Sequence, residues 1–279
     1  MSFQMATRDL ISNLRYRDEL LTILGRMGVR GTLRRRWCRW FGPGGGTVRL
    51  RVAAQSGVFY VHDDRALEWL KSFGGEEQLL TRVIKALQRG DTFYDVGAEV
   101  GLFSAFAAKA VGEEGRVIAF EPEEHRFERL HDNLKLNALK NVRVFRIALS
   151  DRCAQGELLA AQPGTAPRVG PARSASRVGR GQVIRMMTGD SIVGQESLPV
   201  PQAVKIDVEG HELSVLRGLE STLRKPECRL VCCEVHPRLL PAGVEPGEIG
   251  NYLASLGFTR IETVPRPPDF HLIASRGEF

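Results

Sequence analysis

From Thr92 onward, this 279-residue chain alternates between short apolar segments and longer amphipathic segments. Short apolar runs are typical of buried strands, and apolar residues three or four positions apart are typical of helices. Parallel strands need a crossover, usually a helix, so the pattern predicts an α/β fold with a doubly wound, mostly parallel sheet and helices on both faces. The connection at Pro265–Asp269 is too short for a crossover, so the last two strands should pair antiparallel. The expected strands are 93–96, 117–120, 142–149, 203–208, 230–235, 258–264 and 271–274, and the expected helices are 102–111, 123–137, 213–219 and 249–256.

The first 75 residues lack this alternation, and we expect them to form a basic helical and β-hairpin extension. Apolar residues recur with helical spacing over 8–27, which predicts an amphipathic helix. Two segments of alternating polarity, 47–52 and 58–62, flank a turn signal at Gln55–Gly57 and predict a hairpin.

Residues 76–279 form the expected main domain, which one unusual segment interrupts. Gln162–Gly181 is rich in Gly, Ala, Pro, Ser and Arg and contains no acidic residue. This composition is typical of a mobile surface loop, which we expect, and a lid over a substrate is the functional alternative.

The positive charge is concentrated at one end of the chain. The net charge is +6, but residues 1–51 carry 11 Arg against 3 acidic residues, whereas the remainder is slightly acidic. Arginines next to Trp37, Trp40 and Phe41 fit a peripheral membrane contact or an anionic partner at least as well as RNA. The alternative that we favour is an arm that packs its apolar stripe on the main domain.

The five cysteines bear on the cellular compartment. Their odd number, the lack of a CxxC motif and the lack of a secretory signal predict reduced thiols in a cytoplasmic protein. No apolar run approaches the roughly 20 residues that span a bilayer. We therefore expect a cytoplasmic chain, with association at the membrane surface through residues 1–51 as an alternative.

A glycine loop, Asp95-Val96-Gly97-Ala98-Glu99-Val100-Gly101, follows one expected strand and opens the next helix. Gly97 permits a positive φ and a close approach of a ligand to the backbone, and a helix N-terminus offers free N–H groups. Glu121 ends the following strand, 24 residues after Gly97, where an acid in this class of fold accepts hydrogen bonds from ribose hydroxyls. The combination predicts a nucleotide site.

The glycine spacing discriminates between nucleotides. A dinucleotide loop has the pattern G-x-G-x-x-G, whereas this loop has G-x-x-x-G with Asp95 before it. A carboxylate at that position repels a pyrophosphate but suits an ammonium group. S-adenosylmethionine (SAM) carries an ammonium and a ribose and no phosphate, so SAM is the favoured cofactor over NAD.

Polar residues also follow two later strands. Asp207, Glu209 and His211 follow the strand at 203–208, and Glu234 and His236 end the strand at 230–235. Parallel strand ends meet at one edge of the sheet, so these groups should line one site. His211 is the first candidate for a general base and His236 the second, and a helix-capping role is the alternative for both. Asp207, Glu234 and His236 are candidate ligands for Mg²⁺, an alternative that we do not favour because their spacing is not that of a sharp metal motif.

Four segments, Phe93–Leu102, Phe120–Pro122, Lys205–Glu212 and Leu216–Gly218, resemble the FkbM family of SAM-dependent methyltransferases. The resemblance implies a class I methyltransferase fold, with a seven-stranded sheet whose last strand is antiparallel. It also implies methyl transfer to a hydroxyl oxygen of a small-molecule acceptor, such as a glycoside, polyketide or glycolipid.

The resemblance assigns the glycine loop to the methionine part of SAM, Glu121 to the ribose, and Ala148 and Leu149 to the adenine. Glu99 departs from the family, which commonly has Asn at this position. The expected cofactor-binding residues are Asp95, Gly97, Ala98, Glu99, Gly101, Glu121, Ala148, Leu149 and Asp207, and the expected catalytic residues are His211, Asp207, Glu209 and His236.

Two other function classes stay open. An RNA methyltransferase would use the basic arm, but the chain has no Asn-Pro-Pro-Tyr or Asp-Pro-Pro-Tyr motif for base amines, so nucleic acid is not the favoured partner. A non-catalytic nucleotide-binding module is the second alternative, and Glu99 is the feature that favours it.

Overall fold

The computed structural model describes residues 46–61, 64–159, 168–171 and 182–277. The chain divides into two compact units, of which the second comprises Arg49–Phe59 and Glu68–Phe279. The expected helix at 8–27 and the aromatic residues of the basic arm lie outside the described residues, so the partner of that arm stays a prediction. The central sheet and the candidate site described below lie in the second unit.

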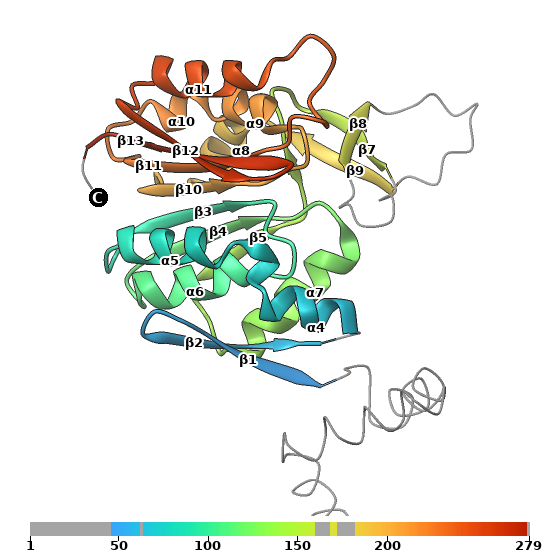
Figure 1. The fold of residues 1–279 in the computed structure, drawn as a ribbon, viewed down its shortest axis with the longest axis vertical. Coiled ribbons are helices and arrows are strands. Elements are labelled where there is room, and N and C mark those ends of the chain that lie inside the picture. Colours follow the sequence, from blue (N-terminus) through green and yellow to red (C-terminus); the bar gives the residue numbers. More distant parts are fainter. Residues whose placement is uncertain (1–45, 62–63, 160–167, 172–181, 278–279) are drawn as a thin grey trace, which may run out of the picture. The chain divides into compact units, whose positions relative to one another are not determined.

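A seven-stranded sheet forms the centre of this unit, in the order β12-β13-β11-β10-β3-β4-β5 (Figure 1). All neighbours pair in parallel except β13, which is antiparallel to both β11 and β12. The predicted mostly parallel sheet with one reversed strand is therefore confirmed. The strands are β3 (Thr92–Val96), β4 (Arg116–Phe120), β5 (Val142–Phe145), β10 (Ala203–Ile206), β11 (Leu230–Val235), β12 (Arg260–Arg266) and β13 (Asp269–Ser275).

Helices cover both faces of the sheet, with α5, α6 and α7 on one face and α8 to α11 on the other (Figure 1). Successive strand residues face opposite sides of the sheet, so Tyr94 and Val96 share a cluster with Leu216 and Leu253, whereas Ala119 of β4 packs with α7. The helices are α4 (Asp64–Lys71), α5 (Glu77–Ala86), α6 (Leu102–Val111), α7 (Glu124–Leu136), α8 (Gly189–Gln195), α9 (Glu212–Gly218), α10 (Glu220–Leu223) and α11 (Pro246–Ser255), with a 3₁₀ turn at Phe73–Gly75.

A second, four-stranded sheet corrects two predictions. It has the order β6-β9-β7-β8 and is built from β6 (Ala148–Leu149), β7 (Ala154–Leu159), β8 (Arg168–Pro171) and β9 (Gln182–Met187). The expected strand at 142–149 is wrong as one element, because β5 ends at Phe145 and β6 pairs with the distant β9. The expected loop at Gln162–Gly181 contains β8, which pairs antiparallel with β7. The break after β5 has no local signal, because β6 pairs with a strand 38 residues further along the chain.

The N-terminal hairpin, β1 (Thr47–Val52) and β2 (Gln55–Tyr60), is also shifted from its prediction. Its turn lies at Ala53–Ala54, where Ala53 has a φ of 51°, and not at Gln55–Gly57. Two-residue hairpin loops need a positive φ, and the sequence offers no glycine at that turn. Gly57 lies within β2 instead, where a Cβ would come 2.8 Å from the Phe59 ring, so its role is close packing.

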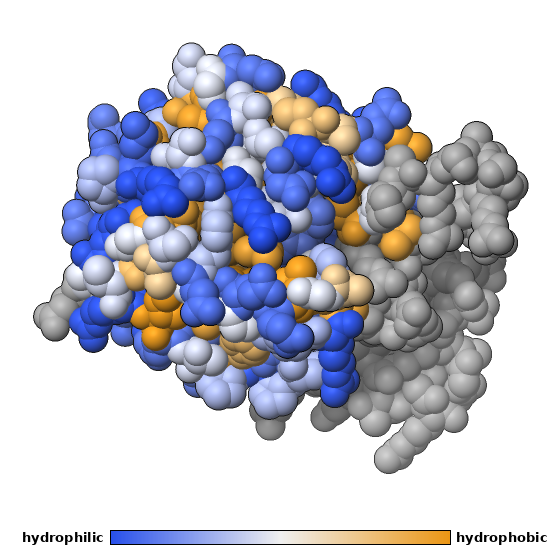
Figure 2. Space-filling view, turned by 90° about the horizontal axis from the view of Figure 1, so that it is seen from above, coloured by the Kyte–Doolittle hydropathy of each residue, from blue (hydrophilic) through white to orange (hydrophobic). Residues whose placement is uncertain are grey.

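In Figure 2, hydrophobic residues on the visible face form small separate groups among polar ones. Val183 is the one large apolar side chain that is exposed among the described residues. Among the same residues, no helix is long and apolar enough to cross a membrane.

Candidate active site

A pocket opens at the carboxyl ends of β3, β4 and β10, beside the small sheet. This is the edge of a doubly wound sheet where ligands bind, because the crossovers leave a crevice there. The pocket includes six of the nine expected cofactor residues, Gly97, Glu99, Glu121, Ala148, Leu149 and Asp207, and three of the four expected catalytic residues, Asp207, Glu209 and His211. Asp95, Ala98, Gly101 and His236 lie outside its lining.

Several lining residues were not predicted from the sequence. Arg126 comes from the first turn of α7, and the small sheet contributes Leu158 and Val169. A cation five residues after an expected ribose-binding acid could have been noticed within the sequence. Leu158 and Val169 could not, since their strands were not predicted. The remaining lining residues are Val96, Phe120, Pro122, Glu123, Ile147 and Val208.

The two glycines of the loop have structural tasks. Gly97 has a φ of 78°, and a Cβ there would overlap the backbone carbonyl oxygen of Asp207. Gly101 caps α6 with a φ of 84°, and a Cβ there would overlap Leu130 of α7. Gly97 therefore lets the loops after β3 and β10 touch, whereas Gly101 lets α6 approach α7. Gly101 was expected at the cofactor, and the structure gives it a packing role.

Asp95 lies beneath the loop as a counter-ion and does not face the pocket. It is fully buried, and one of its oxygens accepts a 2.5 Å hydrogen bond from Ser104 Oγ. Lys205 Nζ lies 3.8 Å from the other oxygen and donates to the Gly97 carbonyl at 2.9 Å and to Asp207 Oδ2 at 3.2 Å. Burial raises the pKa of Asp95. Burial alone would lower the pKa of Lys205, but the nearby carboxylates outweigh it and raise the pKa.

Lys205 thus joins the ends of β3 and β10. Its strand position pairs directly with Asp95, so both side chains lie on the same face of the sheet. Lys205 lies in the segment Lys205–Glu212 that resembles the family, but no role was predicted for it from the sequence. Its buried ammonium is the cation that allows two carboxylates, those of Asp95 and Asp207, to lie next to the loop.

Glu121 occupies the position expected of a ribose-binding acid. Its two carboxylate oxygens accept from the backbone N–H groups of Glu99 at 2.9 Å and Glu123 at 2.8 Å, which fixes the orientation of the side chain. Burial raises the pKa of Glu121 to about 7. Each oxygen keeps a lone pair for a hydroxyl donor.

Glu99, the departure from the family pattern, is neutralised by a partner. Its carboxylate forms a 2.6 Å ion pair with Arg126, and both residues line the pocket. The negative charge of Glu99 is therefore compensated by Arg126 within the pocket. Glu99 has a φ of 48° and Glu209 a φ of 53°, so both loops hold a strained backbone of the kind found at functional sites.

His211 lines the pocket and is half-buried at the start of α9. Its Nε2 lies 2.9 Å from Ser150 Oγ, and Ser150 Oγ donates to Asp151 at 3.2 Å. A serine that donates to Asp151 accepts from His211, which places the imidazole proton on Nε2 and leaves Nδ1 as an acceptor. Burial lowers the pKa of His211, so the ring is neutral at physiological pH. A general base must have a free lone pair, and the neutral imidazole of His211 has one.

His236 has a different environment. Its Nδ1 lies 2.7 Å from Glu212 Oε1, and its Nε2 faces the carboxylates of Asp207, Glu209 and Glu234, each at 3.8 Å. Burial alone would lower its pKa, but the hydrogen bond to Glu212 and the surrounding carboxylates raise it to about 9. An imidazole with this raised pKa already holds its proton at neutral pH, which disfavours His236 as the general base. The candidate metal ligands Asp207, Glu234 and His236 do lie together, within 4.8 Å of one another.

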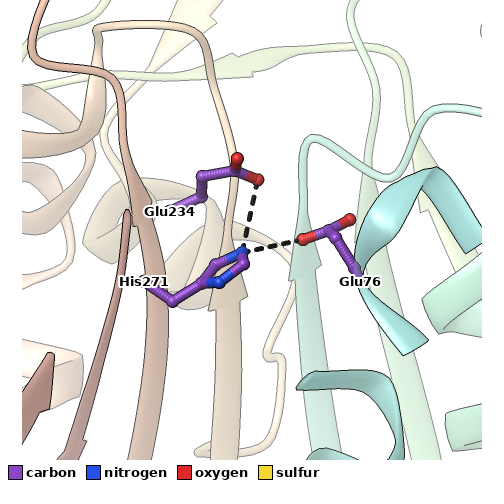
Figure 3. Close-up of side chains that lie close together, drawn as sticks. All are labelled: Glu76, Glu234 and His271. Atoms are coloured by element: carbon purple, nitrogen blue, oxygen red, sulfur yellow. Dashed lines mark hydrogen bonds and ion pairs between the residues drawn. The ribbon is translucent and has the colours of Figure 1, made fainter. Parts of the chain in front are cut away.

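A second cluster shares Glu234 (Figure 3). His271 Nε2 lies 3.1 Å from Glu76 Oε1 and 3.6 Å from Glu234 Oε2, while Arg266 binds Glu234 from another side. Burial would raise the pKa of Glu234, but His271 and Arg266 outweigh it and lower the pKa to about 2. Burial raises the pKa of Glu76 to about 7. The sequence did not predict this cluster, because Glu76 is remote from both strands.

The pocket offers a suitable group for each part of SAM. Ala148, Leu149 and Leu158 offer an apolar surface for an adenine, Glu121 accepts from hydroxyls, and the strand-end carboxylates suit a cationic group. Among the described lining residues, Arg126 is the one Lys or Arg, and it is already paired. A pyrophosphate therefore finds no free cation there, as the glycine spacing had indicated.

Comparisons with known proteins identify the family of this chain. The methyltransferase FkbM domain matches residues 95–259. The hexuronic acid methyltransferase AglP of Haloferax volcanii is 27% identical over 220 residues, which cover 78% of this chain and 85% of the relative. The AMB antimetabolite synthetase AmbE of Pseudomonas aeruginosa is 30% identical over 179 residues, 52% of this chain and 8% of AmbE. The precorrin-6y C5,15-methyltransferase structure from Geobacter metallireducens has a TM-score of 0.45 and 15% identity, covering 71% of this chain and 87% of that one. This chain belongs to the FkbM family of SAM-dependent methyltransferases.

Proposed function

We propose that this methyltransferase acts on a hydroxyl oxygen of a sugar or related small metabolite, with His211 as the general base. The observation that carries the proposal is the neutral imidazole of His211 in the same pocket as Glu121 and the glycine loop. AglP is named for methylation of a hexuronic acid, which supports a sugar acceptor.

The protein's own groups position the reaction. SAM supplies a methyl group on a sulfonium, and an acceptor oxygen must lose its proton as it takes that methyl. The Asp151–Ser150–His211 hydrogen bonds orient the imidazole so that Nδ1 accepts this proton. Glu121 would hold the ribose, and Asp207 would lie at the methyl-donor end.

His211→Gln should lower kcat by about 10²- to 10⁴-fold while leaving SAM affinity unchanged, because a positioned base contributes this much and the amide keeps the bond to Ser150. Wild-type activity should fall as the pH drops below the lowered pKa of His211, since protonation removes the acceptor lone pair. The matched control is His125→Gln, on an exposed histidine of α7. A kcat within twofold of wild type (~0.4 kcal/mol) for His211→Gln would eliminate this base.

Glu121→Gln should weaken SAM binding by about 1–3 kcal/mol, or roughly 5- to 150-fold, because hydrogen bonds to a charged partner are lost. Wild-type affinity should rise as the pH passes through about 7, where Glu121 gains its charge, and the variant should lose this dependence. Titration calorimetry measures both effects. Glu124→Gln, which alters an exposed acid paired with Arg146, is the control. Unchanged SAM affinity in Glu121→Gln would show that this acid does not hold the ribose.

The acceptor class is tested with labelled SAM and a panel of glycosides, uronic acids, polyketides and short RNAs. We expect an alkali-stable O-methyl ether on a sugar hydroxyl, identified by mass spectrometry and NMR. A methylated nitrogen, an ester or an RNA product would replace the proposal with another acceptor.

A further inference from the structure

We propose that Asp207, Glu234 and His236 form a binding site for one first-row divalent cation, such as Mn²⁺, beside the SAM pocket. The three residues come from the ends of β10 and β11, which pair in parallel and so end side by side. One imidazole with two carboxylates suits a first-row ion better than Ca²⁺, which takes oxygen ligands.

The spacing of the ligand atoms fits one shared ion. The nearest donor atoms of the three residues lie within 4.8 Å of one another, and His236 Nε2 is 3.8 Å from both Asp207 Oδ1 and Glu234 Oε1. Ligands bound at about 2.0–2.2 Å lie roughly 3–4.4 Å apart around an ion. A separation of 3.8 Å is too long for a hydrogen bond, so the atoms face one another without bonding. Glu209 Oε2, also 3.8 Å from Nε2, offers a further oxygen.

Outer groups hold each ligand in place. Glu212 is fully buried, and its Oε1 lies 2.7 Å from His236 Nδ1, which directs Nε2 toward the carboxylates. The same oxygen accepts from the Gly210 N–H at 2.8 Å, so Glu212 is itself fixed. Lys205 binds Asp207 Oδ2, and Arg266 binds Glu234. A carboxylate behind a histidine and hydrogen bonds behind ligating carboxylates are the usual outer shell of a metal site.

His236 occupies the centre of the candidate site. Its side chain is 7% exposed, and Nε2 forms ion pairs with Asp207, Glu209 and Glu234 at 3.8 Å each. Metal ligands must give up their protons, so a divalent cation between these atoms would replace the Nε2 proton and bind the imidazole and the carboxylates directly.

The neighbouring cluster of Glu76, Glu234 and His271 does not carry the same inference. His271 Nε2 is already 3.1 Å from Glu76 Oε1, a hydrogen bond (Figure 3), whereas His236 Nε2 lies 3.8 Å from each of its three carboxylate neighbours. That cluster is a closed ion-pair network. Asp207, by contrast, also lines the pocket, so an ion bound to it could reach an acceptor oxygen.

If the proposed function holds, the ion would bind the acceptor hydroxyl and lower its pKa, which eases the proton transfer to His211. This role rests on the proposed function, whereas binding of the ion does not. The two are therefore tested separately.

The test titrates Mn²⁺ into full-length protein that has been dialysed against EDTA, with bound ion measured by EPR and calorimetry. We expect one equivalent to bind and Zn²⁺ to compete. His236→Gln and Asp207→Asn should each weaken binding by at least about tenfold, and the positioning variant Glu212→Gln by about 10- to 100-fold. The matched controls His125→Gln and Glu128→Gln alter exposed residues of α7 and should keep wild-type Mn²⁺ affinity.

Pulsed EPR of the wild-type complex provides a measurement that does not depend on variants folding. Coupling of Mn²⁺ to an imidazole nitrogen supports the site. Absence of stoichiometric binding of Mn²⁺ and Zn²⁺ at millimolar concentration overturns it, and so does loss of binding in His271→Gln but not in His236→Gln. Normal SAM binding and sugar methylation in metal-free protein would remove the ion's role in the reaction and leave the proposed function standing.

Discussion

Lys205→Met should lower the free energy of unfolding by about 3–5 kcal/mol, the usual effect of removing one partner from a buried ion pair. The Lys205 side chain is 5% exposed and lies between Asp95, which is fully buried, and Asp207. Without its ammonium, two carboxylates face each other with no cation, and the Gly97 carbonyl loses a donor. Chemical denaturation measures the loss.

A second substitution tests the cause. Lys205→Met combined with Asp95→Asn should recover part of the lost stability, because the amide removes the charge that Lys205 balanced. Lys140→Met, on an exposed lysine, should change the unfolding free energy by less than about 0.5 kcal/mol. If the double variant is no more stable than Lys205→Met alone, the effect is one of packing and the charge argument fails.

Gly97→Ala should abolish SAM binding and lower the free energy of unfolding by about 4 kcal/mol or more, a size that marks a severe steric conflict. The added Cβ would overlap the Asp207 carbonyl oxygen, which is backbone and cannot rotate away. The loops after β3 and β10 would have to separate. These loops carry Gly97 and Asp207, which both line the pocket. Calorimetry with SAM and denaturant unfolding measure the two effects.

Gly90→Ala is a closely matched control. Gly90 has a φ of 89°, close to the 78° of Gly97, but a Cβ there would meet nothing within 4 Å. Both variants carry the cost of a left-handed alanine, about 1–2 kcal/mol, so their difference isolates the collision. Equal destabilisation of the two variants would show that backbone strain alone explains the glycine at position 97.

Much of the fold could be predicted because it depends on local patterns. The apolar segment at β3 and the helix at α6 are bounded by Gly97 and Gly112, and both were predicted close to their observed limits. The apolar run at 142–149 gave no such boundary, since its break between Phe145 and Ala148 is set by pairing with β9. Pairing between residues far apart leaves little trace in local periodicity.

The two candidate histidines illustrate the same limit within the site. Both follow strands and have the same intrinsic pKa, so the sequence could not separate their roles. The structure surrounds His236 with carboxylates, which raise its pKa to about 9, and buries His211 beside a serine, which lowers it. Most of the groups around each ring lie more than twenty positions away, such as Glu212 for His236 and Asp151 for His211.

The sequence by itself determined the sheet type, the glycine loop, the acid at Glu121 and the polar ends of β10 and β11, because periodicity and short spacings encode them. Only the tertiary structure decided that Lys205 bridges two strand ends, that Arg126 neutralises Glu99, and that a second sheet lines part of the pocket. These features depend on burial and on contacts across the fold. Charge and packing act through distance in space, which the order of residues along a chain does not specify.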